Sequence, residues 1–287
     1  MNVAYRTLLA IAIFAFGYFG IYRPLQLRWG ATTEEVHRAM PGDKIQPRPI
    51  FSSTRAITIA APPEQIWPWL AQIGYHRAGW YGYDWIDNDG IPSSGKILPQ
   101  LQSLNPGDSM PIWRGIDYPV AVVEPNRYLV FESSNHHDSM ALGLYPVEPS
   151  STRLLWRIHL GPYHWTSKLI FSQLFTDLAD FIAVRQALEG VKSRAEGSYH
   201  ATNLIYLELF SWLLMFLGFL FALLTLISRR EWVGPFLLAV LIGSNTVVCV
   251  LVRPRLFADI IGVLVVALAV IALLRKPAPQ AAKPVSA

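Results

Sequence analysis

The chain has 287 residues, of which 52% are hydrophobic and only 15% are charged. Soluble domains usually contain about 25% charged residues, so this composition excludes a chain that is soluble throughout. The net charge of +4 does not indicate nucleic-acid binding, because most Lys and Arg residues flank apolar runs, where they can interact with lipid headgroups. The lone cysteine, Cys249, excludes an intrachain disulfide.

The first apolar run covers residues 7–22 and lies between Arg6 and Arg23. A cleaved signal peptide is one interpretation of such a run, but no small-x-small cleavage pattern follows it. Tyr18 and Tyr22 suit the aromatic belt at a membrane interface, and Arg6 can snorkel. Residues 1–23 are therefore predicted to be an uncleaved membrane anchor.

Three more apolar runs follow at residues 204–227, 233–252 and 256–274. At 1.5 Å per helical residue they approach or reach the roughly 30 Å of a hydrocarbon core. Because the links between them are short, they are predicted to form three antiparallel membrane helices within residues 203–274. The tail, residues 275–287, is predicted to be disordered. The sequence thus predicts a multi-pass protein of the cell membrane, and the loop charges leave the side of the soluble domain open.

Between the anchor and these helices, residues 24–50 are predicted to be a linker and residues 51–197 a soluble α+β domain. Alternating or β-branched runs predict strands at residues 52–59, 109–113, 119–123, 128–132, 140–147 and 153–160. Pro63 and Glu64 mark the start of a helix after the first strand. A long amphipathic helix is predicted over residues 167–196, with Leu174, Leu178 and Phe181 on one side.

Three motifs of this domain resemble the START-like superfamily, also called SRPBCC, which includes polyketide cyclase-like and lipid-transfer proteins. They are the strand leading into residues 61–67 (APPEQIW), the start of a late strand at residues 152–154 (TRL), and the helix ending at residues 189–196 (EGVKSRAE). The resemblance covers about half of the chain. It implies a helix-grip fold, in which a curved antiparallel sheet wraps the last helix and leaves an apolar cavity.

The most unusual stretch, residues 74–88, interleaves aromatic residues with Gly and Asp. Aromatic side chains are large, rigid surfaces that suit a ligand pocket, although they also suit a plug for the sheet or a contact with the lipid interface. We expect the cavity lining to include Trp80, Tyr81, Tyr83, Trp85, Trp113, Phe131, Trp156, Leu174 and Leu178.

Catalysis would need a positioned acid or base, for which Asp84, His136 and His159 are the candidates. Asp87 lies in the same loop as Asp84, and both aspartates can instead cap turns. Residues 136–138 (HHD) offer metal-ligand types, but neighbours on an extended chain point to opposite sides. The sequence therefore predicts no metal site, and no motif indicates a cofactor.

Three functions remain open. The first is a membrane-tethered module that binds an apolar small molecule or lipid in the grip cavity. The second is an enzyme of the cyclase or dehydratase type that uses the same cavity. The third is a structural or sensory membrane protein that docks a protein partner, with Gly234, Gly243 and Ser244 permitting homo-oligomer contacts between membrane helices.

Overall fold

The computed structural model describes residues 2–161, 170–200, 204–229, 231–251 and 255–274. The chain divides into two compact units, residues 1–22 with 203–287 and residues 23–202, and each is described by itself. The predicted tail (275–287) and the predicted first residues of the long helix (167–169) lie outside the described residues.

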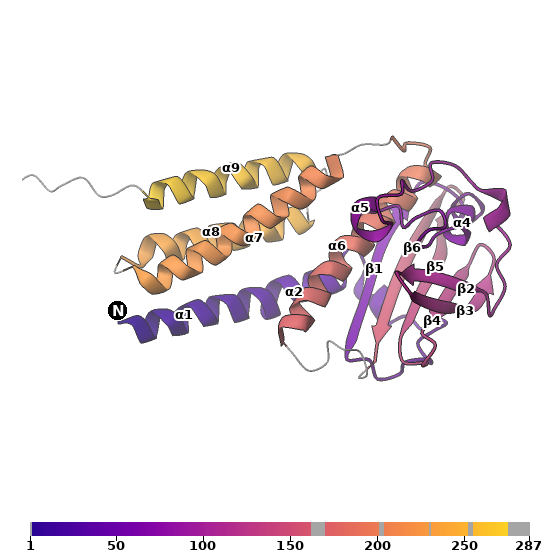
Figure 1. The fold of residues 1–287 in the computed structure, drawn as a ribbon, viewed down its shortest axis with the longest axis horizontal. Coiled ribbons are helices and arrows are strands. Elements are labelled where there is room, and N and C mark those ends of the chain that lie inside the picture. The colour runs from indigo at the N-terminus through magenta and orange to yellow at the C-terminus, as the bar shows by residue number, and fades with distance from the viewer. Residues whose placement is uncertain (1, 162–169, 201–203, 230, 252–254, 275–287) are drawn as a thin grey trace, which may run out of the picture. The chain divides into compact units, whose positions relative to one another are not determined.

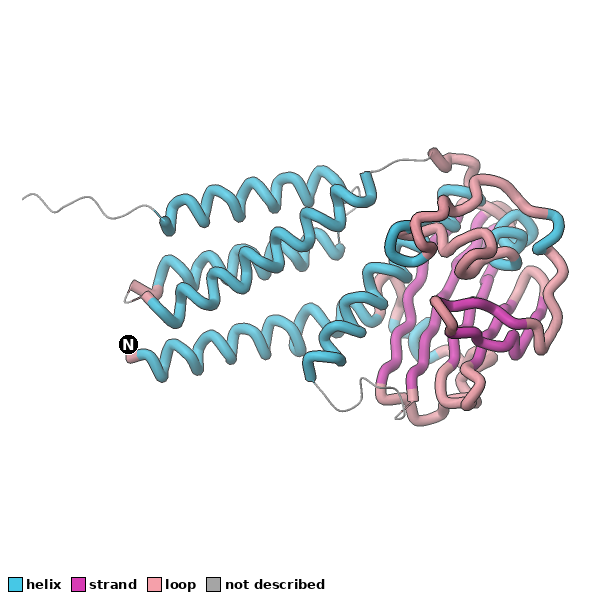
Figure 2. Tube along the Cα trace, in the orientation of Figure 1, coloured by secondary structure: helices cyan, strands magenta, loops and turns pink. Residues whose placement is uncertain are grey.

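The second unit contains a six-stranded antiparallel sheet in the order β1-β6-β5-β4-β3-β2 (Figures 1 and 2). Every described strand lies where the sequence predicts one. The strands are β1 (Phe51–Ile59), β2 (Ser109–Trp113), β3 (Ile116–Glu124), β4 (Tyr128–Glu132), β5 (Ser139–Glu148) and β6 (Ser151–Leu160). The first strand forms one edge of the sheet and pairs with the last strand, so that Arg55 lies opposite Trp156.

Four helices longer than one turn belong to this unit in its described part: α2 (Arg23–Leu27), α3 (Thr33–His37), α4 (Pro63–Ala71) and α6 (Ile170–Ala195). A one-turn helix, α5 (Asp84–Asp87), and a 3-10 turn at Pro99–Leu101 lie in the long connection from α4 to β2. Helix α6 packs on β1, β6 and α4. This α+β arrangement is the helix-grip architecture that the START-like resemblance implies.

The two faces of the sheet are covered by different parts of the chain. On the inner face, defined here as the face toward α6, Arg55 reaches Asp180 and Phe181 of that helix. On the opposite, outer face, Ala56, Val130, Ala141 and Leu155 pack with Met40 and with half-buried residues such as Ala31 and Ile45. The alternation of a β-strand sends neighbouring residues to these two faces.

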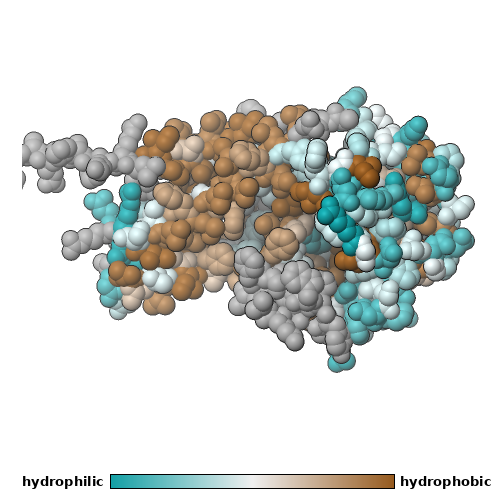
Figure 3. Space-filling model, viewed as in Figure 1, coloured by the Kyte–Doolittle hydropathy of each residue, from teal (hydrophilic) through white to brown (hydrophobic). Residues whose placement is uncertain are grey.

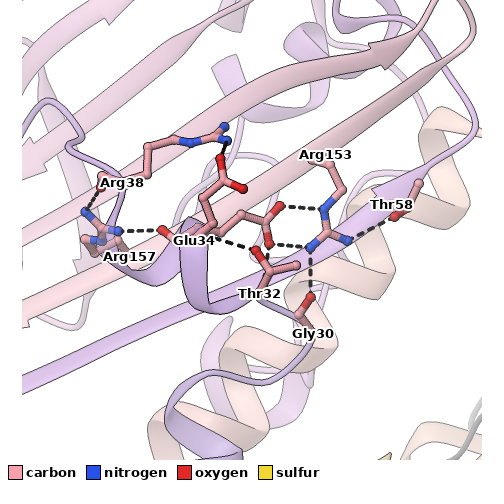
Figure 4. A network of polar contacts seen from close by, with 8 residues as sticks. Gly30, Thr32, Glu34, Arg38, Thr58, Arg153 and Arg157 are labelled. Atoms are coloured by element: carbon pink, nitrogen blue, oxygen red, sulfur yellow. Dashed lines mark hydrogen bonds and ion pairs between the residues drawn. The ribbon is translucent and has the colours of Figure 1, made fainter.

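Residues 24–50 were expected to be a linker, but part of this segment packs on the outer face of the sheet. Helix α3 begins with a capping box between Thr32 and Glu35. The Glu35 carboxylate accepts hydrogen bonds from Arg153 of β6 at 2.8 and 2.7 Å, and Arg153 also donates to the Gly30 carbonyl at 2.8 Å. Figure 4 shows Arg153 at the centre of this network and Arg38 beside Arg157. We call residues 28–46 the strap.

Arg157 fastens the other end of the strap. Its buried guanidinium donates to the carbonyls of Arg38 (2.8 Å), Glu35 (3.0 Å) and Val36 (2.9 Å), and to the Asp43 carboxylate (2.8 Å). A planar guanidinium with five donors can serve several acceptors that no other side chain could satisfy together.

The first unit consists of helices: α1 (Val3–Ala15), the π-helical segment Phe16–Tyr22, α7 (Leu204–Ser228), α8 (Val233–Leu251) and α9 (Arg255–Leu274). Helix α7 packs against α1, α8 and α9 around a core that includes Met215, Ala222, Leu226 and Ile242. The visible surface of this unit is largely hydrophobic (Figure 3).

The structure supports fewer membrane spans than the four predicted. Among the described residues, two helical runs, Val3–Leu27 and Leu204–Ser228, are long and apolar enough to cross a bilayer. In α8 the apolar stretch Val233–Cys249 is shorter, so that helix does not meet the same length criterion.

We predict that Arg157→Leu lowers the free energy of unfolding of the sheet domain by about 3–5 kcal/mol, because it leaves buried strap acceptors without a donor. Chemical denaturation of the detergent-solubilised chain, followed by tryptophan fluorescence, measures this change. The matched control is Arg127→Leu, which removes an exposed pair with Glu124 and should change stability by no more than about 1 kcal/mol. Equal effects of the two substitutions would show that the strap is not fastened by Arg157.

Candidate functional site

The inner face of the sheet contains a buried arginine. Arg55 is 0% exposed, and its Nη1 lies 2.6 Å from Asp180 Oδ2 of α6. Its Nε donates to the Gln26 carbonyl of α2 at 2.8 Å. One turn before Asp180, the buried Asp177 pairs with Arg23 of α2 at 2.6 Å. Two ion pairs therefore join β1, α2 and α6, with two positive and two negative charges.

Two hydrogen-bond donors on this face lack an acceptor. Arg55 Nη2 and the indole Nε1 of Trp156 are both buried and have no partner in the described part of the chain. The two residues face each other across β1 and β6. A buried donor without an acceptor costs roughly 1–3 kcal/mol, and native structures retain few of them. The side-chain amide of Gln26, also fully buried, is unpartnered as well.

Aromatic residues of the connection from α4 to β2 also pack on the inner face of the sheet, next to Trp156. Trp80 packs near Trp156, with ring centroids 6.0 Å apart, and its indole donates to the Ile112 carbonyl at 3.2 Å. The Tyr81 hydroxyl donates to the Trp69 carbonyl at 2.9 Å. The backbone of Tyr81 also lies against Gly190 of α6, where any Cβ would collide with the Tyr81 carbonyl. The connection is thus fixed to the helix.

The structure divides the predicted lining residues into three groups. Trp80, Tyr81, Tyr83, Phe131 and Trp156 are buried. Leu174 and Leu178 are only half-buried, because Asp177, Phe181 and Leu188 occupy the most buried side of α6. Trp85 and Trp113 are exposed on the surface. For the buried and half-buried residues a role in a cavity stays a prediction. Trp85 and Trp113 are exposed to solvent instead.

The three predicted catalytic candidates belong to separate surroundings. Asp84 accepts hydrogen bonds from the backbone and hydroxyl of Ser93. His136 lies at an exposed turn with φ 57° and contacts Glu132 at 3.1 Å. Burial lowers the pKa of His159, which lies near Asp43 of the strap. The structure does not join them in one site, and within the described residues no three His, Cys, Asp or Glu side chains form a metal-binding group.

Asp87 has the most altered acidity in this region. Burial, together with the charge of the neighbouring Asp84, raises its pKa to about 7. One of its oxygens accepts from the backbone N–H of Tyr83 at 2.9 Å, while the other, Oδ1, is buried without a partner in the described chain. A carboxyl that holds its proton near neutral pH can act as an acid or a base.

Four residues of this site were not predicted from the sequence: Arg55, Asp177, Asp180 and Gln26. For Arg55 a signal existed, because it shares the period-2 face of Ile57 and Ile59, which is the face that a strand buries. For Asp180 and Gln26 no local signal exists, because their burial depends on contacts between distant segments.

No protein-family model matches the chain, and neither does any curated protein. Structural similarity was found to a polyketide_cyc-like protein from Corynebacterium glutamicum, Cgl2372, with 16% identity, a TM-score of 0.35, and coverage of 55% of this chain and 100% of that one. Protein MLL2253 from Mesorhizobium loti is 16% identical, with a TM-score of 0.34 over 52% of this chain and 100% of its own. The Aha1 dimer from Colwellia psychrerythraea is 16% identical, with a TM-score of 0.29 over 53% of this chain and 100% of its own. Likenesses at this level tell nothing about ligand or activity.

Protonation of Asp87 should make stability depend on pH. Because the folded pKa is about 7 and the ordinary value is 3.8, the folded state holds a proton that the unfolded state loses. The free energy of unfolding should therefore fall as pH rises through this window, by up to about 4 kcal/mol. Asp87→Asn should remove this component, as measured by denaturant titrations at several pH values. Asp117→Asn, at an exposed position, is the control, and a pH profile unchanged by Asp87→Asn would contradict the assignment.

Proposed function

We propose that residues 51–197 bind an apolar small molecule or lipid that carries a hydrogen-bond acceptor, between the inner face of the sheet and α6. The observation that carries this proposal is the pair of unpartnered donors, Arg55 Nη2 and Trp156 Nε1. An acceptor oxygen of a ligand would remove the cost of burying both. The surrounding side chains, including Phe131 and Leu142, are apolar and buried, which suits the rest of such a molecule.

The charges around these donors favour an uncharged acceptor. Asp180 neutralises Arg55, and Asp177 neutralises Arg23, so the two pairs carry no net charge. A bound carboxylate would add an uncompensated buried charge, which costs several kcal/mol. A ketone, ester or alcohol oxygen supplies the lone pairs without that cost. We therefore infer that the ligand is neutral.

We further propose that the helical unit anchors this domain in the cell membrane through the two runs Val3–Leu27 and Leu204–Ser228, with α8 and α9 packed against α7. Two runs of sufficient length and apolarity, together with the packing of all four helices around one apolar core, support this. Membrane anchoring would place the domain next to a source of apolar ligands.

A second candidate is proton-transfer catalysis at Asp87, supported by its pKa near 7. Of the catalytic candidates expected from the sequence, Asp84 is held by Ser93, and no contact joins His136 or His159 to Asp87 among the described residues. Ligand binding therefore stands first.

Binding is tested with three probes of matched length: methyl nonyl ketone, undecane and undecanoate. In the detergent-solubilised full chain we expect the ketone to bind more tightly than both others, as measured by titration calorimetry. Trp156→Phe keeps an aromatic ring but removes the indole donor, and should weaken ketone binding by about 5- to 10-fold relative to undecane. Comparing wild type and variant in the same detergent cancels partition into micelles.

Trp80→Phe is the matched control, since the Trp80 indole already donates to Ile112. It should leave the preference for ketone over undecane unchanged. Failure of all three probes to bind would contradict ligand binding of this kind. A preference for undecanoate would contradict the inference of a neutral ligand.

A further inference from the structure

Five large apolar side chains lie exposed on two segments of the sheet domain. Trp85, Ile86 and Ile91 belong to α5 and the loop after it, and Trp113 and Ile116 lie at the turn between β2 and β3. Their exposed fractions range from 39% for Trp113 to 75% for Trp85. Single exposed apolar residues are ordinary, but a group of them on adjoining segments marks an interaction surface. We call these five residues the apolar rim.

Contacts between the two segments make the rim one surface. Arg114, next to Trp113, donates to the Asp89 carboxylate, with Nε at 2.6 Å from Oδ1. The Tyr75 hydroxyl donates to the same carboxylate, and the Tyr75 ring stacks on Trp113 with centroids 6.4 Å apart. His76 Nε2 lies 3.1 Å from Asp89 Oδ2. One carboxylate thus ties the loop after α5 to the turn between β2 and β3.

The backbone beneath the rim is fixed in an uncommon conformation. Asp89 and His76 have φ of 53° and 55°, in the left-handed region that non-glycine residues seldom adopt. Such conformations persist where surrounding contacts determine them, and they cluster at functional surfaces. Hydrogen bonds from Arg114 and Tyr75 also hold the pKa of Asp89 down, to about 2. Several contacts thus determine the backbone beneath the rim.

The chemistry of the rim fits the interface of a phospholipid bilayer. Tryptophan combines an apolar ring with a polar N–H and concentrates at that interface, while isoleucine contributes area that can enter the acyl boundary. The same chain carries two helical runs able to cross a bilayer, which would keep a lipid surface within reach.

We propose that the apolar rim inserts into the interfacial region of a phospholipid bilayer. This inference rests on the proposed membrane anchoring but not on the proposed ligand. A site on a protein partner or on a second copy of this chain would bury the same side chains without lipid, and the experiment below separates these occupants.

Nitroxide labels report the surroundings of single positions in the full chain. In a Cys249→Ala background, a label is placed at Ile86→Cys or Ile116→Cys in the rim. A control label is placed at Glu34→Cys on α3, whose side chain is 83% exposed and whose helix covers the outer face of the sheet. The chain is reconstituted in nanodiscs of neutral and anionic phospholipids. Power saturation then compares the accessibility of each label to oxygen, which concentrates in lipid, and to a water-soluble nickel chelate.

Both rim labels are expected to show a several-fold higher ratio of oxygen to nickel accessibility than the Glu34 label. Rim labels as accessible to nickel as the control would overturn the proposal. Protection from nickel that persists in detergent without lipid and grows with protein concentration would assign the rim to a second copy instead. A chain that does not enter nanodiscs would overturn both the membrane anchoring and this inference.

Discussion

The ion pair between Arg55 and Asp180 couples the elements that form the grip. It joins the first strand to the last helix of the domain, and the Arg55 Nε bond to the Gln26 carbonyl adds α2. A fully buried guanidinium is tolerated only where its donors meet acceptors, so the three elements must keep their positions together. The one donor of Arg55 that remains without an acceptor, Nη2, is thus held in place by the contacts of the others. The side chain of Arg55 therefore both holds the three elements together and offers a donor for a ligand.

The outer face of the sheet is fastened by a different pair of arginines. Arg153 and Arg157 alternate along β6 with Trp156, so a single strand presents cations to the strap and an indole to the inner face. The inner face is also covered by the connection that carries the rim, whose Trp80 packs near Trp156. That connection is fixed separately by Asp89 and by its contact with Gly190. The strap and the connection are thus each held to the sheet domain by contacts of their own.

Local patterns were sufficient to predict the strands and the α+β class, while the helix-grip architecture was implied by the START-like resemblance. Alternation in β1, turn residues between the later strands, and Pro63 at the start of α4 are each properties of a few neighbouring residues. The strap was missed because its contacts pair side chains with the carbonyls of a segment that has no hydrophobic periodicity. Its capping box, Thr32 with Glu35, is the only part that a local pattern could have indicated. The sequence also showed an aromatic cluster at residues 74–88 but not which members are buried, because Tyr81 is buried against Gly190 of the distant α6 while Trp85 is exposed.

Ligand binding as proposed requires the indole N–H of Trp156 to donate a hydrogen bond to an oxygen of the bound ligand. The most direct measurement is the ¹H–¹⁵N spectrum of the tryptophan indoles in the full chain, in which the Trp156 signal is assigned as the one absent from Trp156→Phe. On addition of methyl nonyl ketone this signal should move downfield, as expected for a new hydrogen bond, while undecane should leave its proton shift nearly unchanged. An indole signal that responds equally to both compounds, or to neither while the ketone binds, would contradict the claim.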